Sequence, residues 1–317
     1  MRYFFCLLLC SCYNDSYPKK YILTTNVIPK EGGSVEPEKV IIDGGQQISI
    51  TAIPASNYKF DGWQGDLTGV DNPINFIMNS DKNVIALFKL DPFVYYPFNG
   101  DAKDYSGNDI HAEAYNTDLT EDRFGNKNFA YKFNGVNSVI QVNNPGKFIL
   151  SNESFSVSIW VKILDNENTY RTFFIMSNPD VIPRFELMKA RSNIENGGIF
   201  AELYNINNER SVVWSKLNGE DLPKNEWIHL AVVANYDNSQ FSLYINSELQ
   251  ESVNLIDYSS PIEDNIMVRF GETTFSNNIF NRQRHNGSLD DFRFFKKALS
   301  ADEIKQLFNE RFINTKP

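Results

Sequence analysis

Two aspartates stand side by side at Asp290 and Asp291, where a strand-like aromatic segment begins near the end of the chain. Such carboxylates suit three roles: a catalytic pair, a metal site or a surface charge cluster. Alternation along a strand predicts that Asp290 shares a face with Phe292, while Asp291 lies on the opposite face with Arg293. Carboxylates that diverge in this way cannot flank one glycosidic bond, so we do not expect a catalytic pair made from these two alone.

A second group of oxygen-bearing side chains lies far upstream, in the segment DAKDYSGND at residues 101–109. A carboxylate turned toward an apolar face must be paired, protonated or bound to a metal. Closely spaced Asp and Asn around a glycine suit an oxygen-liganded cation such as calcium, although the spacing is not that of an EF-hand. The alternative is an Asx-turn at Asp104 and a surface ion pair between Asp291 and Arg293, without a metal.

Other sites for chemistry are weaker. The chain has no G-x-S-x-G, H-E-x-x-H or phosphate-binding glycine loop, and its three histidines are scattered. Sugar binding needs an exposed aromatic side chain beside polar groups. The weak candidates for such a ligand site are Trp214, Tyr170 with Arg171, and Tyr204.

The elements that position these residues are short strands. In residues 92–312, segments such as NFAYKF, SFSVSIWVKI and QFSLYIN alternate apolar and polar residues between Asn, Asp, Gly and Ser turns. Many short strands without long helices predict an antiparallel sandwich or jelly roll. Only SADEIKQLF is helical in pattern, with Ser300 as the N-cap and Glu303 completing a capping box. Residues 20–90 also alternate and carry turn signals such as KEGGS and DGWQGD, which predicts a small all-β module.

Both regions are similar to known families. The first resembles the divergent B-repeat domain of bacterial surface proteins, through residues 32–33, 44–54, 60–66 and 84–88. The second resembles the laminin-G-like, concanavalin A-like jelly-roll domain, through residues 96–108, 130–142, 154–162, 225–235, 242–250 and 287–308. Ser247 departs from the glycine that this family usually carries in a hairpin turn, and residues 178–225 match no pattern.

The jelly-roll resemblance implies a structural calcium ion that joins the first and last strands. Its ligands would be Asp104, Asn108 and Asp290, with Asp291 a weaker candidate. Hydrolases of this fold carry two or three acidic residues along one strand, whereas Glu202 and Glu226 each stand alone here. We therefore name no catalytic residue. The first hypothesis is non-catalytic binding of a carbohydrate or glycoconjugate, and the alternatives are a protein-binding or structural surface module and a divergent glycan-active hydrolase.

The N-terminal sequence predicts the location of the protein in the cell. MRYFFCLLLCSC has one arginine and an apolar run too short to span a bilayer, as in a secretion signal. LCSC resembles a bacterial lipobox, which implies acylation of Cys12, with residues 1–19 acting as signal peptide and tether. We expect a protein attached by lipid to the bacterial cell envelope, at the outer membrane or cell surface.

Composition sets further bounds. With 317 residues, of which 42% are hydrophobic, the chain can form two domains with real cores. All three cysteines lie in the first twelve residues, which excludes disulfides and cysteine-based zinc sites from the rest. A net charge of −10 excludes extensive contact with nucleic acid, whose phosphates require cationic side chains.

Overall fold

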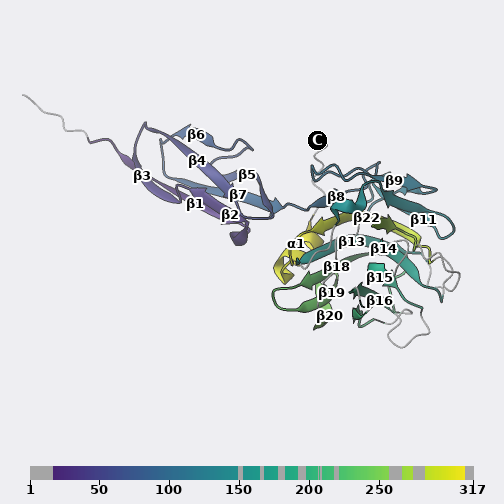
Figure 1. Ribbon diagram of the computed structural model, residues 1–317. Helices are drawn as coiled ribbons and strands as arrows, with labels where there is room; N and C mark the ends of the chain where they lie inside the picture. The colour runs from purple at the N-terminus through teal and green to yellow at the C-terminus, as the bar shows by residue number, and fades with distance from the viewer. Residues whose placement is uncertain are drawn as a thin grey trace, which may run out of the picture. The chain divides into compact units, whose positions relative to one another are not determined.

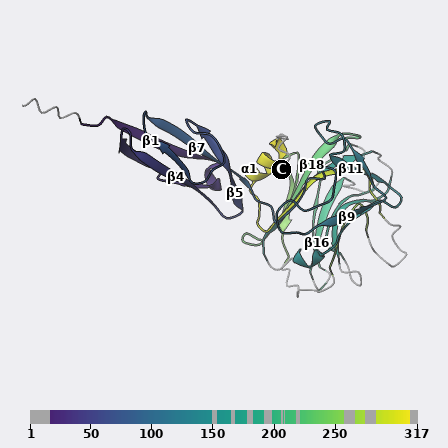
Figure 2. The same ribbon diagram turned by 90° about the horizontal axis from the view of Figure 1, so that it is seen from above.

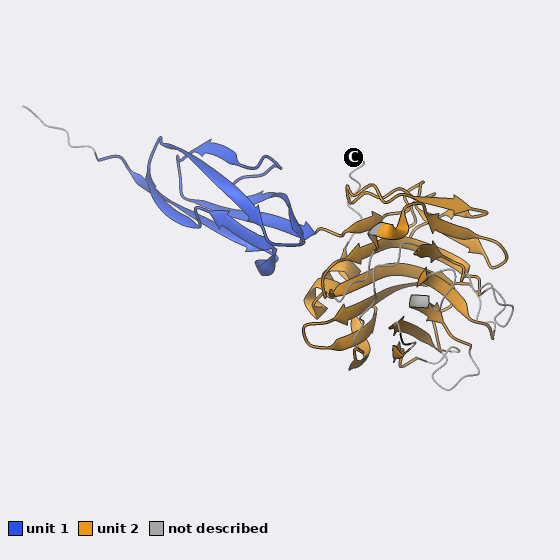
Figure 3. Cartoon of the chain, viewed as in Figure 1, with its two compact units in different colours: residues 1–90 blue, residues 91–317 orange. Residues whose placement is uncertain are grey.

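The computed structural model describes residues 17–148, 153–164, 168–177, 183–191, 198–205, 207, 209–217, 221–256, 266–273 and 283–310. The chain divides into two compact units, residues 1–90 and 91–317 (Figure 3). The predicted lipidation site, Cys12, lies outside the described residues. Among the helices in the described part of the chain, none is long and apolar enough to cross a bilayer.

The first unit is built from two small sheets (Figure 1). A four-stranded sheet has the order β3-β1-β7-β5, in which β1 and β7 are parallel, and a three-stranded sheet has the order β2-β4-β6. The strands are β1 (Lys20–Ile28), β2 (Gly33–Glu36), β3 (Lys39–Asp43), β4 (Gln47–Pro54), β5 (Tyr58–Gly65), β6 (Ile74–Ile77) and β7 (Lys82–Leu90), with a 3-10 turn at Lys30–Gly32.

Alternating side chains from these strands form the core of the first unit. Trp63 is 4% exposed, packs on Phe60 at 5.0 Å between ring centroids, and donates its indole N–H to the carbonyl of Asp71 at 2.8 Å. A tryptophan with its ring buried and its N–H satisfied fills a core rather than forming a sugar platform.

The second unit is a sandwich of two antiparallel sheets, seen from two directions in Figures 1 and 2. Sheet I has the order β10-β11-β22-β13-β18-β19-β20, with β8 also paired to β22. Its strands are β8 (Val94–Tyr96), β10 (Asp118–Thr120), β11 (Ala130–Asn134), β13 (Phe155–Ile163), β18 (Trp227–Asn235), β19 (Gln240–Ile245), β20 (Glu248–Asn254) and β22 (Asn286–Phe295).

Sheet II has the order β17-β16-β15-β14-β21-β12-β9. Its strands are β9 (Ala112–Tyr115), β12 (Val139–Val142), β14 (Arg171–Ser177), β15 (Pro183–Lys189), β16 (Ile199–Tyr204), β17 (Arg210–Trp214) and β21 (Met267–Phe270). A 3-10 turn at Pro145–Lys147 follows β12. Strands β15, β16 and β17 come from the region that matched no sequence pattern, so this region completes the second layer.

Between the two sheets lies one large apolar core. Every second residue of β13, from Phe155 to Ile163, points into it, and aromatic side chains such as Phe174, Phe270 and Phe292 fill its centre. The helix α1 (Ala301–Asn309) begins with the predicted capping box, because Ser300 and Glu303 bond each other's backbone N–H groups. The prediction of an all-β chain with a jelly-roll sandwich and one short C-terminal helix is confirmed.

Candidate functional site

The paired aspartates lie on one face of β22, contrary to the alternation predicted from the sequence. Residues 158 and 160 of β13 pair with Arg293 and Asp290, so two residues, Asp291 and Phe292, stand opposite one residue of β13. This is a β-bulge, and Asp291 has the positive φ of 48° that it requires. The bulge adds one residue to the alternation, which turns both carboxylates away from the core while Phe292 stays in it.

Both carboxylates bind the same arginine. Arg123, in the loop after β10, donates to Asp290 at 2.8 Å and to Asp291 at 2.7 Å. Arg293 donates to the other oxygen of Asp291 at 2.9 Å and to Glu310 at 2.6 Å. The predicted Asp291–Arg293 pair is therefore present, but it is buried rather than on the surface.

The electrostatics of the two aspartates differ. Burial and the neighbouring charge of Asp291 raise the pKa of Asp290, and Arg123 opposes this shift. Burial also acts to raise the pKa of Asp291, but Arg293 and Arg123 together hold it below its usual value. The two guanidinium groups therefore favour the charged form of Asp291, whereas burial disfavours that of Asp290.

The upstream loop uses its aspartate to hold its own backbone. Asp104 accepts hydrogen bonds from the backbone N–H groups of Tyr95, Ser106 and Ile110 and from the Ser106 hydroxyl, at 2.8–3.1 Å. The bond from the Ser106 N–H is the predicted Asx-turn. Asn108 donates its side-chain amide to the carbonyl of Phe93 at 3.0 Å.

These residues do not fit a calcium ion in this arrangement. Four donors occupy the lone-pair directions of Asp104, and guanidinium groups bond one oxygen of Asp290 and both oxygens of Asp291, where a metal would need free oxygens. Within the described residues, no three His, Cys, Asp or Glu side chains form a group that could hold a metal ion. The predicted calcium ion is untested, and this arrangement of the four residues argues against it.

The helix α1 covers part of the outer face of sheet I beside this network. Phe308 stacks on Trp160 at 5.7 Å, and Trp160 also lies 4.8 Å from the guanidinium carbon of Arg123. His229 is fully buried, contacts the Ser158 hydroxyl at 2.8 Å, and has its pKa lowered by burial to about 3. A neutral, buried histidine beneath a helix has a structural role.

The outer face of sheet II carries a second, smaller apolar cluster, in which Trp214 and Tyr170 are partly exposed, whereas Met188 and Phe200 are buried. Met188, Phe200 and Trp214 lie opposite one another on three adjacent strands, and we call them the aromatic row. Trp214 stacks on Phe200 at 4.8 Å, and Tyr170 meets Phe200 edge-on at 6.2 Å. Trp214 and Tyr170 are half-buried, and their cluster is separate from the main core.

Two to four residues further along the same strands lies a polar group. Glu186 on β15 pairs directly with Glu202 on β16, and Tyr204 pairs with Arg210 on β17. Arg210 donates to Glu202 at 2.7 Å and to the Tyr204 hydroxyl at 3.4 Å. We call Glu186, Glu202, Tyr204 and Arg210 the polar group.

The carboxyl groups of this polar group have shifted pKa values. Burial and the charge of Glu202 raise the pKa of Glu186 to about 8. Burial also raises the pKa of Glu202, although Arg210 and Tyr204 oppose the shift. Burial raises the pKa of Tyr204 to about 12, so its hydroxyl stays protonated at neutral pH. The group thus offers hydrogen-bond donors and acceptors beside an aromatic surface.

The structure brings three of the four predicted ligand residues together. Trp214, Tyr170 and Tyr204 share the outer face of sheet II, whereas Arg171 is buried and donates to the carbonyl of Arg284 at 3.0 Å. Glu186 was not predicted as the partner of Glu202, because the two carboxyl groups come from different strands and not from one strand. The alternation of Phe200, Glu202 and Tyr204 was the only signal for a shared face.

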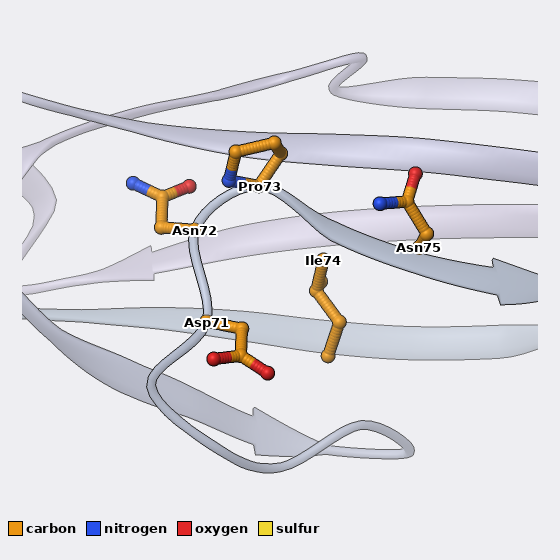
Figure 4. Close-up of a pocket in the computed structure, with 5 residues that line it drawn as sticks. All are labelled: Asp71, Asn72, Pro73, Ile74 and Asn75. Carbon is orange, nitrogen blue, oxygen red and sulfur yellow. The ribbon is translucent and has the colours of Figure 1, made fainter.

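A small pocket in the first unit does not form a comparable site. It is lined by five consecutive residues, from Asp71 in the loop before β6 to Asn75 in β6 (Figure 4). The Asn72 side chain bonds both the N–H and the carbonyl of Ala52 at 2.8 Å, which fixes the loop against β4. The Asn72 side chain is therefore already hydrogen-bonded within the first unit.

Comparison with known families agrees with this architecture. A model of the concanavalin A-like lectin/glucanases superfamily matches residues 134–305, more than half of the chain. A model of the divergent InlB B-repeat domain matches residues 23–92. No curated protein sequence matches the chain.

Solved structures share the fold of the second unit. Domain 4 of AbnA, a GH43 extracellular arabinanase from Geobacillus stearothermophilus, solved in complex with arabinotriose, has a TM-score of 0.54 and 20% identity, covering 69% of this chain and 98% of that chain. The botulinum neurotoxin serotype D binding domain has a TM-score of 0.51 and 23% identity, covering 69% of this chain and 51% of that chain. The chain thus spans about half the length of the neurotoxin domains that it matches.

Proposed function

Because the chain belongs to the concanavalin A-like lectin/glucanases superfamily, we propose that its second unit is a non-catalytic recognition domain for a carbohydrate or glycoconjugate. The observation that carries this proposal is the pair of partly exposed aromatic side chains, Trp214 and Tyr170, which pack on the buried Phe200 beside the polar group on the outer face of sheet II. Sugar rings present apolar C–H faces and polar hydroxyl edges, which such a surface can contact together. The arabinotriose held by the AbnA domain supports the choice of ligand class.

The test is glycan binding by the purified chain and two tryptophan variants. Trp214→Ala removes the outer end of the aromatic row, and we expect it to weaken binding by at least about tenfold, which corresponds to about 1.4 kcal/mol. Trp227→Ala is the matched control, because Trp227 is also half-buried but lies on sheet I. If no glycan in an array binds the wild-type chain, the proposal is wrong and a protein-binding role becomes the better explanation.

We also propose that the chain is a lipoprotein of the bacterial cell envelope, which uses the recognition domain in adhesion or polysaccharide capture. The support is the short apolar leader that ends in LCSC, and the acyl group would be carried by Cys12. The replacement Cys12→Ser is expected to abolish incorporation of labelled fatty acid and to release the protein from the membrane fraction. Retention of both would show that the anchor lies elsewhere.

A further inference from the structure

Glu186 carries a buried oxygen without a partner. The residue is 4% exposed, and its Oε1 has no hydrogen-bond partner in the described part of the chain. Its strand neighbours are Ile175 on β14, which has no polar side-chain atom, and Glu202 on β16. The nearby cation, Arg210, is already bonded to Glu202 and to Tyr204.

A buried carboxyl oxygen without a hydrogen-bond partner lowers the stability of the fold. Leaving a buried polar atom unsatisfied costs about 1–3 kcal/mol, so native proteins pair nearly all of them with protein, water or ligand. An apolar residue at position 186 would remove this cost. The unsatisfied Oε1 of Glu186 therefore indicates a hydrogen-bond partner that comes from outside the chain.

We propose that Glu186 and Glu202 form a subsite for the hydroxyl groups of a neutral sugar and exclude glycans that carry carboxylate or sulfate groups. This inference rests on the proposed function and names its ligand class. Hydroxyl groups donate to carboxyl oxygens. Glu186 keeps its proton near neutral pH, and the Arg210 guanidinium is already bonded to Glu202, so the carboxylate or sulfate of an acidic sugar would lose its water there without gaining a counter-ion.

The placement of the subsite suits one ligand that also contacts the aromatic row. Glu202 follows Phe200 by two residues on β16, so the two rows lie about 7 Å apart along the strand. Trp214 continues the aromatic row at the end of β17, and Arg210 begins the same strand four residues earlier. The Arg210 side chain is 54% exposed, so the polar group opens to solvent at this strand.

A cation, Arg191, lies on the side of the aromatic row away from Glu186. The guanidinium of Arg191 stands 5.3 Å from the ring centroid of Tyr170, which itself contacts Phe200. The aromatic row therefore lies between the positive charge of Arg191 and the Glu186–Glu202 pair. Selection against anionic sugars is therefore expected at the carboxyl pair and not at the Tyr170 end.

The experiment uses neutral and acidic sugars that are otherwise matched. Titration calorimetry of the purified chain compares lactose with sialyllactose, and neutral arabinan and galactan oligosaccharides with galacturonan oligosaccharides. Where a neutral sugar binds, we expect it to bind at least about tenfold more tightly than its acidic counterpart, which corresponds to about 1.4 kcal/mol. Equal or tighter binding of the acidic members would overturn the inference.

Two variants separate this subsite from the aromatic surface. Glu186→Gln is expected to weaken neutral-sugar binding about fivefold or more and to narrow the difference between neutral and acidic sugars, while the exposed Glu226→Gln changes neither. An unchanged affinity in Glu186→Gln, with altered thermal stability alone, would show that Glu186 binds only water and would overturn the subsite. If Trp214→Ala still weakens binding in that case, the proposed function stands without this subsite.

Discussion

Arg123 and Asp290 are joined by a hydrogen bond of 2.8 Å although 167 positions separate them in the sequence. The bond ties the loop after β10 to the last strand, and the bulge at Asp291 lets the same guanidinium bind the next carboxylate too. The Arg123 guanidinium also lies between the rings of Phe124 and Trp160, at 4.4 and 4.8 Å. One side chain therefore bonds two buried carboxyl groups and packs on Trp160 of β13.

Removing this arginine should be strongly destabilising. Arg123→Met keeps an apolar stem but leaves two buried carboxylates with one guanidinium, and breaking a buried pair costs about 3–5 kcal/mol. Urea unfolding of the second unit measures this loss. Lys132→Met is the control, because Lys132 is exposed on β11, and we expect less than about 1 kcal/mol there. A loss as small as that of the control would show that the network contributes little.

The same network bears on the calcium prediction. The carboxylates assigned to the ion are engaged by Arg123, Arg293 and backbone N–H groups, so we expect EDTA and added calcium to leave the melting temperature unchanged. The measurement is a thermal melt in EDTA and in millimolar calcium at constant ionic strength. A calcium-dependent rise that is lost in Asp104→Asn would show instead that these residues rearrange around an ion.

The sequence predicted those features that local patterns determine. The capping box at Ser300 needs only two residues three positions apart, and the alternation in β13 needs only its own nine residues. The position of Asp291 could not be predicted, because a bulge depends on how β22 pairs with β13 and on the distant Arg123. The Glu186–Glu202 pair depends on the register of β15 with β16, which a single sequence does not reveal.

The N-cap of α1 gives a test of local stability. Ser300→Ala removes the hydroxyl that accepts from the Glu303 N–H, and we expect a loss of about 1 kcal/mol in the free energy of unfolding. Ser300→Gly should cost only a few tenths of a kcal/mol, since glycine is also accepted at N-caps. Urea unfolding compares the two variants. Equal losses in both would show that the helix end is held by its packing on sheet I and not by the cap.

The buried carboxyl of Glu186 should make stability depend on pH. Its pKa is raised by burial from 4.5 to about 8, so between these values the folded protein retains a proton that the unfolded chain has lost. The contribution of this group therefore falls as pH rises across that window, by up to about 1.4 kcal/mol per pH unit. Glu186→Gln cannot ionise, so we expect its stability relative to wild type to increase from pH 5 to pH 8. Urea unfolding at pH 5, 6, 7 and 8 measures the difference, and Glu226→Gln, which alters an exposed carboxyl, controls for the change in charge. A constant difference between Glu186→Gln and wild type would mean that Glu186 ionises normally and has access to water, which would contradict its burial beside Glu202.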